Sequence, residues 1–572
     1  MVAPVPWFPP AGRMSRLLTP ALLALALAIA LPALWPLAPG PSVNAVPLLL
    51  AWSLVALTVL ALPDGGPWRW REPALLLAFF VAATAASGAV GSPDWWTTGA
   101  ALLAVGACGV IGRAAQTDRA LARALALGWV TAGAVSAAIA WLQFSGQSAE
   151  FYPWVNLTSV GEAFGNLRQR NLFATLTSLA VLALIWLGAT CKDQPGLRGG
   201  ILVAGLVLVA GNALSVSRTG FFQLVLILAL CLTWGAHHHR ALRPLLWALL
   251  PCYAASAVGL PALLGLDAHV DLFTRLTEGA PACSSRVALW SNVLELIAQH
   301  PWSGWGWGRL DQAHYEHLYA GLRFCDILDN AHNLPLHLAV ELGVPVALVL
   351  CGAAGWWCWR GRPWRERDPL RQMAWGFVAI LGLHSLLEYP LWYGPFQIAL
   401  GLALGLLSQG KVANPPGPGE PARPAGILAR HLKRLLPVSA LGLLIAAAWD
   451  YGKVSQIYLA PEARGRWWQG DAFALAGDTW FFRAQGDFAR LTLTPLARDN
   501  ARSVLASAQA LIAYSPEPRV IERLIESATL AGQDELALWH LARYRAAFPE
   551  AHAQWARGLH TPLPQRPAPT TP

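Results

Sequence analysis

The chain has 572 residues, of which 55% are hydrophobic and only 13% are charged. This charged fraction is about half of that in an average soluble domain, which excludes an ordinary soluble globular protein. The formal net charge of +9 is not gathered in a basic domain, because most arginines and lysines lie in short loops between apolar segments. Their placement favours an orientation signal in a membrane over a surface that binds nucleic acid.

Runs of roughly 20 mostly apolar residues, the length that crosses a bilayer, recur from Leu17 to about Trp449. We count about thirteen such runs, which predicts an all-α, polytopic membrane protein. Arg13 and Arg16 before the first run are also typical of a secretory signal, but the many spans that follow favour an uncleaved first helix. The predicted spans are centred near Leu27, Val55, Val81, Val105, Ser136, Ala180, Leu206, Ile227, Ala255, Val346, Ala379, Ala403 and Leu443.

Basic residues gather in alternate loops, which places those loops and the N-terminus in the cytoplasm. These loops contain Arg69 and Arg71; Arg113, Arg119 and Arg123; Lys192 and Arg198; Arg240 and Arg243; Arg360, Arg362, Arg365 and Arg367; and Lys411 to Arg434. The opposite side, which we call the external side, then receives the remaining connections. They are residues 145–170, 217–219, 266–331 and 389–395, and everything after about Asp450.

These assignments divide the chain into four parts. They are a membrane core (1–408) that includes the large external loop (266–331), a cytoplasmic linker (409–434), a last span (435–450) and an external C-terminal domain (451–572). The linker holds five prolines and three glycines between Asn414 and Gly426, a composition that does not form a helix.

Two helices are predicted in the C-terminal domain from their periodicity: Arg519–Leu530, ended by Gly532, and Asp534–Ala547, ended by Pro549. Such a pair is typical of a tetratricopeptide-like repeat or of a simple helical packing domain.

Of the eight cysteines, only Cys283 and Cys325 fall on the external side. Disulfides persist in oxidising compartments, so we expect this pair to form a disulfide within the large loop.

Two arginines on the external side are candidates for anion binding, since ionisable groups at the ends of spans are often functional. Arg218, in SVSRTG, lies where the orientation rule disfavours a basic residue. A guanidinium matches two phosphate oxygens at once, and the alternative is a snorkelling arginine at a helix end. Arg286 has no acidic neighbour within four residues, and either a second phosphate clamp or a solvated helix-start charge fits its position.

His332, in DNAHNLPLHL, lies where the large loop meets the membrane, between Asn330 and Asn333. A histidine there can accept the proton of an acceptor hydroxyl near neutral pH, or it can be a hydrogen-bonded structural residue. His337 lies on a different face of the following helix, so the two histidines do not form a metal pair of the HExxH type. Glu341 is placed to pair with His337 structurally.

Two further external segments carry polar residues. Arg168, Gln169 and Arg170, in GNLRQRN, suit sugar hydroxyls or phosphates, or else anchor the segment at the membrane. Glu388 and Tyr389 lie in an apolar, aromatic stretch. An unpaired buried carboxylate costs several kcal/mol, so Glu388 is predicted to be protonated or paired with a cation.

Together, these segments resemble the O-antigen ligase (Wzy-C) superfamily, and more closely its protein O-oligosaccharyltransferase branch. The matching stretches are GNLRQRNLFA (165–174), SVSRTG (215–220), RVALW (286–290), HPWSGWGWG (300–308), NAHNLPLHLAVELG (330–343) and residues 384–395. The resemblance implies a glycosyltransferase of the GT-C type in the bacterial inner membrane, with its active site and C-terminal domain in the periplasm. It also implies that neither a metal nor a cofactor is needed.

The resemblance implies roles for these residues. Arg218 and Arg286 would hold the diphosphate of an undecaprenyl-linked glycan, and His332 would activate an acceptor hydroxyl for inverting attack. The expected substrate-binding residues are Asn330, Asn333, Arg168, Gln169, Arg170, Glu388 and Tyr389.

Three parts of the chain favour a serine or threonine of a protein such as a pilin as the acceptor: the GNLRQRN segment, the LEYPLWYGP segment and the sizeable C-terminal domain. Ligation to lipid A core and O-antigen polymerisation are the alternatives within the superfamily. A transporter of lipid-linked glycan is the alternative from another class, but candidate residues that gather on one side favour an enzyme. A purely structural envelope protein fits these membrane-end residues poorly.

Overall fold

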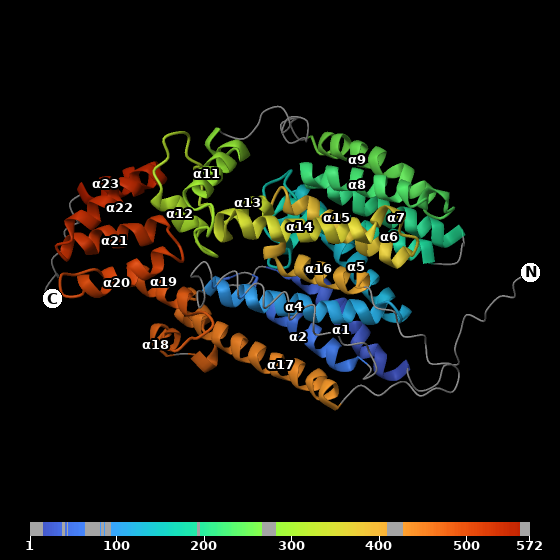
Figure 1. The fold of residues 1–572 in the computed structure, drawn as a ribbon, viewed down its shortest axis with the longest axis horizontal. Coiled ribbons are helices and arrows are strands. Elements are labelled where there is room, and N and C mark those ends of the chain that lie inside the picture. The colour runs from blue at the N-terminus through green and yellow to red at the C-terminus, as the bar shows by residue number, and fades with distance from the viewer. Residues whose placement is uncertain are drawn as a thin grey trace, which may run out of the picture.

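The computed structural model describes residues 15–36, 41–42, 44–62, 81, 85, 93–190, 195–265, 282–408, 427–468 and 470–560. Within these ranges every regular element is a helix and there is no strand (Figure 1), which confirms the predicted all-α class. Most of the predicted third span, loop residues 266–281 and linker residues 409–426 lie outside the described residues.

Six described helices are long and apolar enough to cross a membrane, and four shorter apolar helices accompany them. The chain is therefore a multi-pass membrane protein, while the predicted number of about thirteen spans stays a prediction. The bundle contains α1 (Ser15–Leu34), α2 (Ala45–Ala61), α4 (Pro93–Ala115), α5 (Arg119–Phe144), α6 (Arg170–Thr190), α7 (Pro195–Leu214), α8 (Arg218–Thr233), α9 (Arg243–Leu263), α13 (Leu334–Leu342), α14 (Val344–Gly361), α15 (Pro369–Ser385), α16 (Gly394–Leu407) and α17 (Ile427–Ser455).

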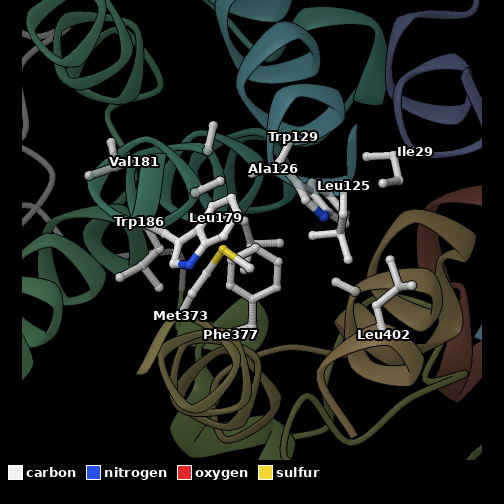
Figure 2. Close-up of a cluster of buried hydrophobic side chains, with 14 of the residues drawn as sticks. Ile29, Leu125, Ala126, Trp129, Leu179, Val181, Trp186, Met373, Phe377 and Leu402 are labelled. Atoms are coloured by element: carbon white, nitrogen blue, oxygen red, sulfur yellow. The ribbon is translucent and has the colours of Figure 1, made fainter. Parts of the chain in front are cut away.

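Helix α6 is the centre of the bundle and contacts α5, α7, α8 and α15. Its sequence is apolar on all sides, as expected of a helix surrounded by others, and 89% of its apolar stretch is buried inside the protein. Figure 2 shows Trp129 of α5 beside Phe377 of α15, where the two rings meet edge to face with centroids 5.6 Å apart. This central packing holds α6 against α15, and the start of α6 and the end of α15 adjoin the site residues.

A second layer covers one end of the bundle. It contains the loop helices α11 (Arg286–Gln299) and α12 (Leu310–Glu316), followed along the chain by α18 (Ala472–Gly477), α19 (Arg483–Leu493), α20 (Ala501–Ile512), α21 (Pro518–Leu530), α22 (Asp534–Ala547) and α23 (Pro549–His560). Figure 1 shows α19–α23 gathered beside α11 and α12 at that end. We call these helices the end layer.

The two helices predicted in the C-terminal domain are confirmed as α21 and α22, with Gly532 at a φ of 74° in the turn between them. A β-carbon strains such a left-handed backbone, which explains the glycine at the break.

The large loop and the C-terminal domain contact each other directly. The hydroxyl of Tyr315 in α12 lies 2.9 Å from Nδ1 of His540 in α22, and Nε of Arg543 donates to the carbonyl oxygen of Glu316 at 2.8 Å. Tyr315 is buried within the hydrophobic core of the C-terminal domain. The loop and the C-terminal domain are therefore held together as one layer.

Candidate active site

Glu388 is the centre of a polar cluster that joins four separate segments of the chain. Its carboxylate bonds to Nη2 of Arg286 and accepts from Nδ2 of Asn171 at 3.2 Å. The other carboxylate oxygen lies 2.7 Å from Nδ1 of His332 and accepts from Nε2 of Gln169 at 3.5 Å. The Glu388 side chain is 7% exposed, so the structure pairs this buried carboxylate with a cation, one of the two states predicted for it. We call these five residues the Glu388 cluster.

The backbone around Glu388 continues the last turn of α15. Its N–H donates to the carbonyl oxygen of His384 at 2.8 Å. The cap residue of α13, Asn333, contacts this turn. Its Nδ2 donates to the carbonyl oxygen of Leu386 at 3.1 Å. This bond ties the end of α15 to the start of α13, and so brings Glu388 and His332 together.

Three helices that carry site residues begin at side-chain caps. Ser217 caps α8, Ser285 caps α11 and Asn333 caps α13, and each accepts from the backbone N–H three residues further on at 3.1–3.2 Å. Side-chain oxygens at this position satisfy one of the free N–H groups at a helix start. Arg218 and Arg286 are consequently the first residues of their helices.

The two asparagines beside His332 differ in what they contact. Both polar side-chain atoms of Asn333, a predicted substrate-binding residue, are engaged within the protein as described above. Oδ1 of Asn330 accepts from the N–H of His332 at 3.0 Å, while Nδ2 of Asn330 is buried without a hydrogen-bond partner among the described residues. Asn330 therefore orients the backbone of His332 and still has a free donor.

Further buried polar atoms of the cluster lack partners. Within the described part of the chain, Nη1 of Arg286 and Oε1 of Gln169 are buried and make no hydrogen bond. Buried polar groups are normally satisfied, and each exception needs an explanation. A ligand that supplies both donors and acceptors, such as a glycan with a phosphate, would satisfy them.

Unusual backbone conformations also mark these segments. Four described residues other than glycine have a positive φ, and three of them are Arg168 (59°), Val216 (50°) and His332 (50°). This region is disfavoured for residues with a β-carbon, most of all for a β-branched one such as Val216. Strain of this kind clusters at functional sites, and here it coincides with three segments that the sequence analysis singled out.

Arg218 is connected to the Glu388 cluster through its neighbour in the chain, Ser217. The hydroxyl of Ser217 donates to Oδ1 of Asn171 at 2.6 Å, while Nδ2 of Asn171 binds Glu388. Arg218 itself is exposed and has no ion-pair partner among the described residues. The free N–H groups of a helix start also favour an anion there.

The remaining predicted substrate-binding residues differ in whether they contact the Glu388 cluster. Gln169 joins the cluster, but Arg170 pairs with Glu162 instead. Arg168 holds its left-handed conformation at the end of a short 3₁₀ turn. The ring of Tyr389 meets His332 edge to face, with centroids 4.9 Å apart, and burial raises the pKa of Tyr389, so this phenol stays neutral.

The charge of Glu388 follows from its neighbours. Burial by itself raises the pKa of this carboxyl, but the side-chain contact with His332 and the electrostatic effects of His332 and Arg286 outweigh it and hold the pKa below its ordinary value. Glu388 is therefore an anion at neutral pH. This anion lies beside Nδ1 of the His332 ring, and Nε2 of His332 makes no hydrogen bond within the described residues.

His337 and Glu341 form the structural pair that the sequence predicted. Their Nε2 and Oε2 atoms lie 3.3 Å apart and both side chains are almost fully buried. The glycine-rich run after Pro301 contacts α13, the helix that carries His337 and Glu341. The N–H of Trp305 donates to the backbone carbonyl of Val340, and the N–H of Gly306 donates to that of Glu341, both at 2.9 Å. These contacts fix α13 behind His332 and keep His337 out of the Glu388 cluster.

The structure joins Cys283 and Cys325 by a disulfide, with their Cα atoms 5.3 Å apart. Arg286 follows three residues after Cys283. The disulfide therefore ties the start of α11, which carries Arg286, to the distal part of the large loop.

Two residues of the site were not singled out from the sequence: Asn171 and Ser217. Both lie within segments that were noted, and both stand at the start of an apolar helix. That position is the only sequence signal they give, because their link to each other and to Glu388 exists only after α6, α8 and α15 pack together.

The fold and the site define a multi-pass helical membrane protein whose charged, partly unsatisfied polar site lies where one end of the bundle meets the end layer. Known protein families match three parts of this chain. Residues 200–351 match the O-antigen ligase family, residues 163–187 match the protein glycosylation ligase family, and residues 372–560 match the C-terminal region of the virulence factor membrane-bound polymerase family.

Two curated relatives come from Acinetobacter baylyi. A general O-oligosaccharyltransferase is 28% identical over 255 residues, which is 43% of each chain. A ComP-specific O-oligosaccharyltransferase is 25% identical over 265 residues, 44% of this chain and 45% of the relative. The chain thus matches less than half the length of these relatives. The predicted resemblance to the O-antigen ligase superfamily and its protein O-oligosaccharyltransferase branch is confirmed.

Proposed function

We propose that this protein is a glycosyltransferase that moves a preassembled glycan from undecaprenyl diphosphate to a serine or threonine hydroxyl of a protein. The observation that carries the proposal is the pairing of His332 with Glu388, whose carboxylate also binds Arg286. A base oriented by a carboxylate next to a phosphate-binding cation is the arrangement that this transfer needs. The two relatives named as O-oligosaccharyltransferases support it.

The proposed reaction is a single displacement with inversion. The acceptor hydroxyl oxygen attacks the anomeric carbon, and its proton passes to Nε2 of His332. The bond from the anomeric carbon to the diphosphate oxygen breaks, and undecaprenyl diphosphate leaves with the electron pair. Glu388 stabilises the imidazolium that forms, as a buried carboxylate does for an oriented histidine base.

The leaving diphosphate carries the negative charge that develops in this step. Arg218 is exposed and has no ion-pair partner among the described residues, so its guanidinium is available for phosphate oxygens. Arg286 already uses Nη2 on Glu388, and its Nη1, which has no partner among the described residues, is a donor left for the substrate. Two guanidinium groups supply the positive charge for the leaving group, so the proposed mechanism requires neither a metal nor a cofactor.

We also propose the placement of this site. The basic loops predict that the bundle's other end faces the cytoplasm, so the Glu388 cluster and the end layer face the periplasm of a bacterial inner membrane. No nucleotide sugars are present there, which is the reason for a lipid-linked donor. We propose the domain division 1–408, 409–434, 435–450 and 451–572 on the same grounds.

The decisive test compares wild type with His332→Ala in a bacterium supplied with a defined undecaprenyl-linked glycan and a pilin. The matched control is His431→Ala, because His431 is exposed near the start of α17 and has no part in the site. We expect a glycan-sized mass gain on the pilin with wild type and the control, and none with His332→Ala.

The same cells distinguish the alternatives. A gain on lipid A core instead of the pilin would replace the proposal by an O-antigen ligase, and growth of the lipid-linked glycan itself would replace it by a polymerase. If neither acceptor gains mass at normal expression, a glycan transporter becomes the better explanation.

A further inference from the structure

The segment between the last span and the C-terminal helices exposes large aromatic side chains that the proposed reaction does not use. Trp467 is 83% exposed and Trp480 is 69% exposed, and Tyr458 and Phe481 are also exposed. Water-exposed tryptophans of this kind are unfavourable unless something covers them. We call residues 456–482 the aromatic segment.

Asp450 fixes one part of this segment against α17. Its carboxylate is buried, and Oδ2 accepts from the N–H groups of Trp480 at 2.8 Å and Phe481 at 2.7 Å. The next residue, Phe482, packs its ring against Tyr451, with centroids 5.2 Å apart. Trp480 and Phe481 are therefore held within roughly two turns of the end of α17.

A second contact fixes the other part. Oε1 of Gln456 accepts from the N–H of Gly465 at 3.0 Å, and the ring of Trp468 packs against Trp449 of α17 with centroids 5.3 Å apart. Trp468 is thus used for packing, while its neighbour Trp467 stays exposed. The chain at both exposed tryptophans is thus held at the same end of α17, and Figure 1 shows α18 beside that end.

The exposed apolar side of α17 leads directly to these aromatics. Helix α17 carries one of the six candidate spans, and Val438, Ile445 and Trp449 are exposed along one side of it, at spacings of seven and four residues. A span with such a face meets lipid, and the end of the span lies at the lipid headgroups. Tryptophan and tyrosine favour this zone because their rings are apolar with one polar atom.

We infer that the aromatic segment lies in the lipid headgroup layer, where Trp467 and Trp480 insert, and that it fixes the height of the C-terminal domain above the membrane. Lipid is the occupant that the surface fits, since the segment continues the lipid-facing side of α17. The domain is joined to the large loop through Tyr315 and His540, so this anchor also sets the position of that loop. The inference does not depend on the proposed function.

Photocrosslinking tests the inference in the full-length protein, reconstituted in nanodiscs of phosphatidylethanolamine and phosphatidylglycerol. Benzoylphenylalanine replaces Trp467 or Trp480, and in a control protein it replaces Leu538, which is exposed on α22. All three positions are exposed, so the substitutions leave the core intact.

After illumination, intact-mass analysis should show a phospholipid-sized gain at positions 467 and 480 but not at position 538. Equal lipid capture at all three positions, or none at 467 and 480, would overturn the inference. Crosslinking of 467 or 480 to a second copy of the chain would overturn it too, because the aromatics would then form a protein interface.

Discussion

Nδ1 of His332 lies 2.7 Å from Oε2 of Glu388, and this contact joins the start of α13 to the end of α15. The same carboxylate binds Arg286 from the large loop and Asn171 from α6. A single buried anion therefore holds the proposed base, one proposed phosphate-binding residue and the start of the central helix in one arrangement.

Replacing Glu388 by glutamine should reduce glycan transfer by about 10²-fold or more, the usual scale of a lost acid–base contribution. The amide carries no charge for Arg286 or for the His332 imidazolium. Glu366→Gln is the matched control, because Glu366 pairs with Arg371 at 2.8 Å away from the cluster. Transfer rates in proteoliposomes measure both, and an equal loss in the control would contradict a role specific to Glu388.

Arg218→Ala should weaken binding of the lipid diphosphate by roughly tenfold or more, which corresponds to about 1.4 kcal/mol or more. The fold should be unaffected, since Arg218 is exposed and unpaired within the described structure. Arg286→Ala should weaken the same binding and also release Glu388. Binding measured by displacement of a fluorescent lipid-linked donor tests both, with exposed Arg240→Ala as control. Unchanged donor affinity in both single variants would remove the diphosphate assignment.

Ser217 caps α8 and also binds Asn171, and two variants of Ser217 test both contacts. Ser217→Ala removes the α8 cap, at a cost of about 1 kcal/mol, and the bond to Asn171. Ser217→Thr keeps a hydroxyl for both. We expect a lower unfolding temperature and weaker donor binding in the alanine variant, with near wild-type values for threonine. If donor binding is equal in the two variants, the Asn171–Ser217 link does not position Arg218.

Reduction of the Cys283–Cys325 disulfide should loosen the large loop. The cysteines are 42 residues apart, and closing a loop of this length restricts the unfolded chain by about 4 kcal/mol. The paired variant Cys283→Ser with Cys325→Ser should lose thermal stability and transfer activity, whereas Cys351→Ser, at a free cysteine, should lose neither. Mass analysis after alkylation without reductant checks the bond itself, and labelling of both residues would exclude it.

The end layer should become less stable as the pH falls below about 6.5. Burial, the charge of Arg323 and the charge of His317 lower the pKa of His314 to about 3 despite a backbone hydrogen bond. The unfolded chain therefore binds a proton at His314 between these pH values and the folded chain does not, so stability is lost as the pH decreases.

Between pH 6.5 and pH 5, His314 should lower the free energy of unfolding by about 2 kcal/mol. His540, whose pKa burial lowers to about 4, acts in the same direction. Thermal unfolding of wild type and His314→Gln at several pH values measures the effect, and the variant should show a smaller slope. An identical slope in both proteins would contradict this account.

Local patterns were enough to identify many parts of this protein. Hydrophobic runs predict the all-α membrane class, because a run long enough to cross a bilayer can be recognised from consecutive residues alone. Gly532 and Pro549 predicted the C-terminal ends of α21 and α22 correctly, since glycine and proline end helices by their own backbone preferences. Glu388 was expected to be protonated or paired with a cation, because burial of a lone carboxylate is costly wherever it occurs.

Only the tertiary structure decided which cation that is. Arg286 is separated from Glu388 by α11, α12, α13, α14 and α15 in the chain, and no local pattern connects them. Packing of those helices also assigned Asn333 to a helix cap, directed Arg170 to Glu162, and used Asn171 and Ser217 to link α8 to the cluster. Side-chain types and helix starts are local properties, whereas the partner of a buried polar atom depends on which helix ends meet, and that is a property of the whole bundle.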